Sequence, residues 1–132
     1  MIQAFREAVA QQLPLPDTGD LREDIRLQLR NFLKLLAGRR GRMFKAFIVA
    51  AQNDPEVAET FQTIWREPHR RTVKNGLERH RNEALRESVD LDLLVDMMYG
   101  ALYYRLLLPG DALSPDDTDA LADIVLRGIA KR

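Results

Sequence analysis

Histidine and serine are the residue types in this sequence that could support catalysis or bind a metal. His69 and His80, the only histidines, lie eleven positions apart, so a straight helix would put both on one face near Glu83 and could hold a metal ion. We favour the alternative of two solvated histidines on a basic surface. The two serines, Ser88 and Ser114, fall at turn or cap positions and leave little material for a Ser/His/Asp nucleophile. We therefore expect that the protein is not an enzyme.

Two short patterns offer other chemistry. Asp92 and Asp96 lie one helical turn apart and could act as an acid/base or metal-binding pair, but no nearby residue suggests a partner, which favours a solvated strip. Residues 38–42 (GRRGR) could cradle a phosphate, yet they lack the Lys-Ser/Thr ending and the preceding strand of a P-loop. We interpret them as a turn between helices. The sequence thus predicts no metal and no cofactor.

Composition describes one globular domain. The chain has 132 residues, 45% of them hydrophobic, with 20 basic and 20 acidic side chains and no cysteine. The absence of cysteine excludes disulfides, thiolate metal sites and a cysteine nucleophile. Residues 1–12 lack the apolar core of a secretory signal, so we expect a cytoplasmic protein. Overall neutrality predicts that this chain alone binds DNA poorly, because phosphate neutralisation needs a basic excess.

Helical periodicity between proline and glycine residues predicts an all-α fold of about six helices, with no convincing strand. The clearest start signals are Asp17 or Thr18 as one N-cap, Asp54-Pro55 as another, and Ser114-Pro115 as the last. The predicted helices span about residues 2–12, 18–36, 43–51 (apolar on nearly every side, and therefore central), 55–85 with a kink at Pro68, 91–108 and 115–130.

The segment 91–108 is apolar on two opposite sides. A membrane span would need about 20 apolar residues, and Asp92, Asp96 and Arg105 make one costly. A second subunit explains the second face better, and this predicts a homodimer in which the last two helices pair with their copies as a four-helix bundle. The predicted dimer interface comprises Leu93, Met97, Gly100, Tyr104, Leu107, Leu121, Ile124, Val125 and Gly128.

Aromatic residues from three segments should converge near the expected kink. Imperfect packing beside Pro68 can leave a cavity, but a solid aromatic core is an open alternative. The residues concerned are Phe44, Phe47, Phe61, Trp65 and Tyr99.

Several motifs carry a resemblance to a known family. They are residues 54–58 (DPEVA), 67–71 (EPHRR), 100–107 (GALYYRLL) followed by Pro109-Gly110, and 126–128 (LRG). In this order and spacing the sequence resembles the C-terminal regulatory domain of tetracycline-repressor-like (TetR family) transcription regulators, over about residues 18–130.

This resemblance implies a domain organisation and a function. Residues 1–13 would be a connector helix from an N-terminal DNA-binding domain that is missing here, and residues 14–132 would bind an effector and dimerise. DNA would be contacted only through the missing domain. The resemblance also implies an effector pocket among the earlier helices, and on physical grounds we expect the five aromatic residues above to line it and to bind a small apolar effector. The chief alternative is a ligand-free helical homodimer whose basic face, within residues 66–86, docks on an acidic partner.

Overall fold

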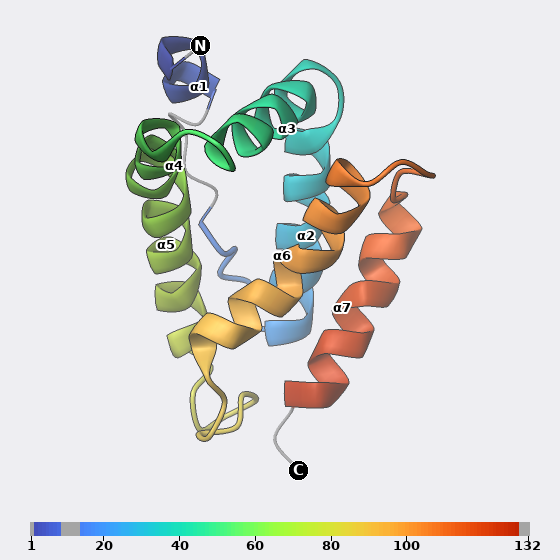
Figure 1. The fold of residues 1–132 in the computed structure, drawn as a ribbon. Helices are drawn as coiled ribbons and strands as arrows, with labels where there is room; N and C mark the ends of the chain where they lie inside the picture. The colour runs from blue at the N-terminus through green and yellow to red at the C-terminus, as the bar shows by residue number, and fades with distance from the viewer. Residues whose placement is uncertain (1, 9–13, 130–132) are drawn as a thin grey trace.

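Helices make up the regular structure of this chain in a computed structural model, which describes residues 2–8 and 14–129 (Figure 1). In chain order the elements are α1 (Ile2–Ala8), α2 (Leu21–Leu36), α3 (Arg39–Ala51), α4 (Pro55–Phe61), the π-helical turn η1 (Gln62–Arg66), α5 (Glu67–Glu78), α6 (Leu91–Leu107) and α7 (Pro115–Ile129). Within the two described ranges there is no strand, and a single isolated β-bridge joins Arg81 to Leu85. The all-α fold expected from the sequence is confirmed. Part of the expected connector, residues 9–13, lies outside the described ranges.

The central helix is α2, which packs against α3, α6 and α7 (Figure 1). Asp20 begins it by accepting a hydrogen bond from the amide of Arg22 at 3.0 Å. The predicted cap at Asp17 or Thr18 is wrong, because Thr18 is engaged elsewhere. Its amide and hydroxyl donate to Asp24 at 2.9 and 2.6 Å, which fixes the preceding turn onto the helix.

The third helix starts earlier than the sequence predicts. Gly38 has φ of 70°, a left-handed conformation that reverses the chain at once, so the helix begins at Arg39. Gly41 then lies so close to α2 that an added Cβ would come within 1.6 Å of the carbonyl oxygen of Leu36. As a result α3 covers one end of the molecule (Figure 1), and Val49 is 54% exposed. The expectation that this segment is central is wrong.

Proline punctuation shapes the long helical run from α4 to α5. Asp54 caps α4 as predicted, accepting from the amides of Glu56 and Val57 at 3.0 and 3.4 Å. Pro68 has no N–H, and its ring would clash with the carbonyl four residues back in a regular α-helix. The turn before it is accordingly widened into η1, so the expected kink takes the form of a π-turn.

The helix after Pro68 ends at Glu78, earlier than the predicted end near residue 85. A compact loop replaces its last turns. Asn82 adopts a φ of 70°, and the amide of Leu85 donates to the carbonyl of His80 at 3.0 Å. These local bonds compete with helix continuation, and the helical periodicity alone could not reveal them.

The last two helices pack against the central helix. Ser114 caps α7 as predicted, with the amide of Asp117 donating to its hydroxyl at 3.2 Å. Arg30 of α2 binds Asp119 of α7 through two hydrogen bonds of 2.9 and 2.6 Å. Within residues 2–8 and 14–129, no helix combines the length and apolar character that crossing a membrane requires.

Candidate functional site

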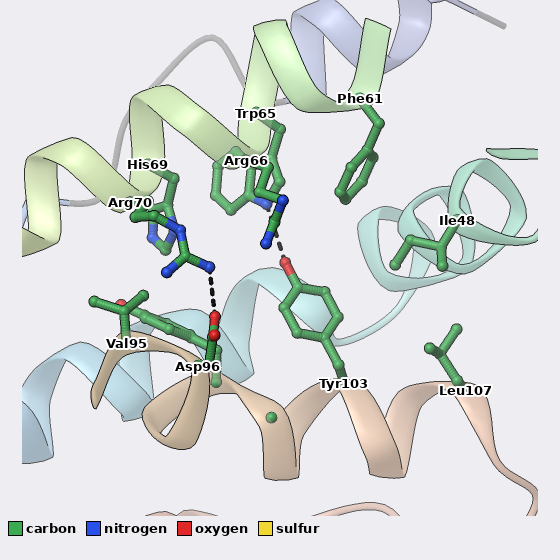
Figure 2. A pocket seen from close by; sticks show the side chains of 12 residues that line it. Ile48, Phe61, Trp65, Arg66, His69, Arg70, Val95, Asp96, Tyr103 and Leu107 are labelled. Atoms are coloured by element: carbon green, nitrogen blue, oxygen red, sulfur yellow. Dashed lines mark hydrogen bonds and ion pairs between the residues drawn. The ribbon is translucent and has the colours of Figure 1, made fainter. Parts of the chain in front are cut away.

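A pocket of about 300 Å³ lies among α3, the α4–η1–α5 run and α6. Figure 2 shows side chains of η1 and α5 approaching it from one side and those of α6 from the other. The lining is mainly apolar, with a few polar groups, which is typical of a small-molecule site. Its residues are Ile48, Phe61, Trp65, Arg66, His69, Arg70, Val95, Asp96, Tyr99, Gly100, Tyr103 and Leu107.

Trp65 forms one wall of the pocket. Its indole Nε1 donates a hydrogen bond to the Tyr103 hydroxyl at 3.0 Å, drawn as a dashed line in Figure 2. Phe32 of α2 stacks against the indole, with 6.0 Å between ring centroids. Burial raises the pKa of Tyr103 to about 12, so its hydroxyl stays protonated at neutral pH and can still donate.

His69 lies one helical turn after Trp65 and stacks on it, with 4.3 Å between centroids and 15° between planes. The prediction of a solvated histidine is wrong, because the residue is only 5% exposed. Burial, assisted by the charge of Arg70, lowers the pKa of His69 to about 4, so the ring is neutral at pH 7. Its Nε2 atom is buried and has no hydrogen-bond partner among the described residues.

The mouth of the pocket carries an ion-pair network. Arg70 of α5 pairs with Asp96 of α6 (Figure 2) and with Asp92, where Nη1 and Oδ1 are 3.4 Å apart. Lys74 also binds Asp92 at 3.1 Å, and this hydrogen bond is the main cause that lowers the pKa of Asp92. Asp92 and Asp96 are exposed, as predicted. The prediction that they have no partner is wrong. Their partners come from another helix and join α5 to α6.

The five aromatic residues expected at the pocket divide into two groups. Phe61, Trp65 and Tyr99 line it. Phe44 and Phe47 are fully buried behind it. The structure therefore brings all five into one aromatic region, but only three of them face the cavity.

Sequence reasoning missed the polar atoms of the pocket. His69 and Tyr103 follow Trp65 and Tyr99 by four residues each, a spacing that places both members of a pair on one helical face. That spacing was the available signal. We did not use this spacing to place His69 in the pocket, because Arg70 and Arg71 follow it directly and favour a solvated basic surface.

The second histidine lies in a different part of the molecule. His80 is buried, so the solvated expectation is wrong here too, and its Nε2 is 3.0 Å from Asp24 of α2. It follows the end of α5 and shares no helical face with His69. In the parts of the chain that the structure describes, no three His, Asp or Glu side chains are grouped to hold a metal ion.

Comparison with known proteins places this architecture in a family. The family model described as "Tetracyclin repressor-like, C-terminal domain" matches residues 15–125. The chain belongs to this domain family. The expected resemblance is thereby confirmed, and with it a TetR-like C-terminal regulatory fold.

Two relatives are similar over almost all of the domain. The "Uncharacterized HTH-type transcriptional regulator YdeS" of Bacillus subtilis (strain 168) is 32% identical over 130 residues, which are 98% of this chain and 66% of YdeS. The crystal structure of "TetR family transcription regulator SCO0332" matches with a TM-score of 0.87 and 32% identity. That match covers 97% of this chain and 71% of the other. This tetracycline-repressor-like domain thus spans just under two thirds of YdeS.

One face of this tetracycline-repressor-like domain exposes large apolar side chains. On α6, Leu93, Met97 and Tyr104 are 58%, 53% and 62% exposed, and on α7 Ile124 is 69% exposed. We call these four residues the α6–α7 apolar face. The opposite side of α6 is buried in the chain itself, through Leu91, Leu94, Val95, Met98, Tyr99 and Leu102. The two-sided apolar character of α6 is therefore observed in a single chain.

The other residues expected at a dimer interface differ in their positions. Gly128 faces open space, and Leu121 is half-buried. Gly100 and Leu107 line the pocket. Val125 is 2% exposed and packs inside its own chain, since α7 turns this residue toward the core.

Four of the seven basic side chains within residues 66–86 pair with acidic side chains of the same domain. Arg70 and Lys74 bind the aspartates of α6, Arg79 lies 3.5 Å from Asp17, and Arg81 lies 3.2 Å from Glu78. These contacts reduce the charge that a docked acidic partner would meet, which disfavours the interaction-module alternative.

Proposed function

We propose that this domain binds a small, largely apolar effector in the Trp65 pocket and transmits its occupancy through α1 to a DNA-binding domain. One observation carries the proposal. Phe61, which lines the pocket, stacks on Phe5 of α1 with 5.6 Å between ring centroids. The pocket wall and the first helix are therefore in direct contact.

Phe5 is seated in an aromatic cluster that a ligand could rearrange. It has no exposed surface. Its ring centroid also lies 4.2 Å from that of Phe47 and 5.3 Å from that of Phe44. A ligand that shifts Phe61 changes the packing around Phe5. Such a shift alters DNA binding only if the ligand has different affinities for two arrangements of α1.

We further propose that the domain acts as a homodimer through the α6–α7 apolar face. Four large exposed apolar side chains on adjacent helices are unusual for a monomer and favour an isologous contact. Paired with the same helices of a second copy, α6 and α7 would form a four-helix bundle with crossing angles of about 20°.

DNA binding is proposed from the relatives. Both are named as transcription regulators, YdeS as an HTH-type one, and both are longer than this chain. We infer that α1 connects to a helix-turn-helix domain. In a two-fold dimer, two such domains reach successive major grooves when they lie about 34 to 36 Å apart, so a small shift of α1 changes the fit.

An NMR titration of this chain with naphthalene tests whether pocket occupancy is transmitted through Phe61 to Phe5 of α1. Trp65 is the single tryptophan, so its indole N–H gives one resonance that reports pocket occupancy. We expect the Trp65 indole and the Phe5 ring resonances to shift with the same saturation curve. A Phe5 signal that stays fixed while the indole shifts would disprove the coupling. An indole that does not shift would disprove the pocket.

A longer regulator that contains this domain tests the outcome on DNA. We expect an effector to change operator affinity by about 5- to 150-fold, the usual range of allosteric coupling. Unchanged affinity at effector saturation would overturn the proposal.

A further inference from the structure

One cation at the Trp65 pocket has no acidic partner. Arg66 lines the cavity and is exposed, so it lies where the cavity meets solvent. It donates to the side-chain oxygen of Gln62 at 3.0 Å, and within residues 2–8 and 14–129 it forms no ion pair. The Gln62 amide is neutral and leaves the guanidinium charge uncompensated. A free positive charge beside an apolar cavity favours a ligand that has a negative group.

The other charges around the pocket balance one another. Arg70 pairs with Asp92 and Asp96, and Lys74 pairs with Asp92, so two cations meet two carboxylates. Of these four residues, Arg70 and Asp96 line the cavity. With Arg66 added, the charged side chains that line the cavity have one more positive than negative charge.

The acidic residue that follows Arg66 in the chain is engaged elsewhere. Glu67 accepts a hydrogen bond from the Gln62 side-chain nitrogen at 2.7 Å and is not among the residues that line the cavity. The Gln62 amide therefore binds Arg66 through its oxygen and Glu67 through its nitrogen. Because Arg66 contributes surface to the cavity, a bound anion can meet its guanidinium there.

A second hydrogen-bond donor faces the same part of the cavity. Figure 2 shows the Arg66 side chain extending from η1 toward the Tyr103 hydroxyl of α6. Burial raises the pKa of Tyr103 to about 12, although the Trp65 hydrogen bond and the charge of Arg66 oppose the rise. The hydroxyl accepts the Trp65 N–H at 3.0 Å and keeps its own proton. A carboxylate between Arg66 and Tyr103 could accept from both groups.

The walls of the pocket favour an aromatic body for the ligand. They present the rings of Phe61, Trp65, Tyr99 and Tyr103, and aromatic rings pack well against one another. A volume of about 300 Å³ is at the lower end for ligand sites, so it suits one or two fused rings. The rings would lie inside and the anionic group at the mouth, where contact with water lowers the cost of binding a charge.

We propose that the ligand class of this site is a small aromatic carboxylate, whose ring contacts Trp65 and whose anionic group pairs with Arg66. This inference rests on the effector pocket proposed above. It adds the charged group that the pocket selects.

Two matched probes test the selection: 2-naphthoate and 2-naphthamide, which share a shape and differ in charge. Binding is measured by calorimetry at pH 7, and pocket occupancy by the Trp65 indole resonance. We expect 2-naphthoate to bind about fivefold more tightly, which is the upper range for an ion pair in contact with water. Added salt should narrow this difference, because it screens such a pair.

Variants at position 66 assign the preference to the arginine. Arg66→Gln should lose the preference for 2-naphthoate and retain the affinity for 2-naphthamide. Arg66→Lys keeps a positive charge and should restore part of the preference. Arg71→Gln is the matched control, since Arg71 is exposed on α5 and does not line the cavity. It should retain the full preference. Thermal melting of each variant confirms folding.

The outcomes separate this inference from the proposed function. Equal affinity for the two probes, with the indole shifted by both, would overturn the carboxylate class and leave the pocket standing. An indole resonance that responds to neither probe would overturn both proposals. A preference that persists in Arg66→Gln, or that Arg71→Gln abolishes equally, would overturn the pairing with Arg66.

Discussion

His69 couples the stability of the domain to pH. The histidine of an unfolded chain takes up a proton near pH 6.5, whereas burial lowers the pKa of His69 to about 4 in the folded domain. Between these values the unfolded state binds more protons than the folded state. The stability that the neutral ring contributes is therefore present above pH 6.5 and is lost as the pH falls toward 4.

Denaturation at two pH values measures this effect. Lowering the pH from 7 to 5 should cost the wild-type domain about 2 kcal/mol of unfolding free energy through His69 alone. His69→Phe should lose that part of the pH dependence and be at least as stable at pH 7, because the variant buries no unpaired polar atom. Urea denaturation at one protein concentration gives both values. Identical pH dependence in the two proteins would contradict the assignment.

The π-turn is the element that orients Trp65 toward Tyr103. Pro68→Ala restores an N–H and removes the ring clash with the preceding turn, so we expect η1 to relax toward a regular α-helix. The indole would then rotate and lose its hydrogen bond to Tyr103. The Trp65 indole resonance should move and naphthalene affinity should fall, with no loss of thermal stability.

Pro55→Ala is the matched control for this change. Pro55 occupies the first position of α4, where an N–H is not needed. The indole resonance should stay in place in this variant. A Pro68→Ala protein with an unchanged indole resonance would show that the π-turn does not depend on the proline.

The sequence predicts helix boundaries set by neighbouring residues better than it predicts contacts between residues that lie far apart in the chain. Asp54 and Ser114 were identified as caps because a cap depends on the next three residues. His80 and Asp24 were not paired, because 56 positions separate them and no periodicity reports such a contact. The same limit hid the partners of Asp92 and Asp96. The sequence predicts three of the aromatic residues that line the pocket but not His69, because the arginines that follow this histidine make its helix appear solvated.

The two-sided pattern of α6 is informative about assembly, because only one of its apolar sides meets its own chain. The sequence could not show which side that is, since both sides are equally apolar. Because the other side of α6 is buried in the single chain, the α6–α7 apolar face is the surface that the proposed second copy would cover.

A charge in this face tests the dimer. Met97 and Val49 are 53% and 54% exposed, so they form a matched pair on and off the α6–α7 apolar face. Met97→Glu should convert the protein to monomers in sedimentation velocity at micromolar concentration, because a buried unpaired carboxylate is costly. Val49→Glu should leave the dimer intact. A wild-type chain that sediments only as a monomer would remove the dimer from the proposal.

Phe5 has a consequence for how such a regulator can diversify. It is the only side chain of α1 described as fully buried, and it touches the pocket through Phe61 without lining the cavity. Under the proposed mechanism, a substitution at this one position could change how strongly a bound effector alters operator affinity, while leaving both the chemical selectivity of the pocket and the base-reading surface as they were. Sensitivity and recognition could then evolve independently.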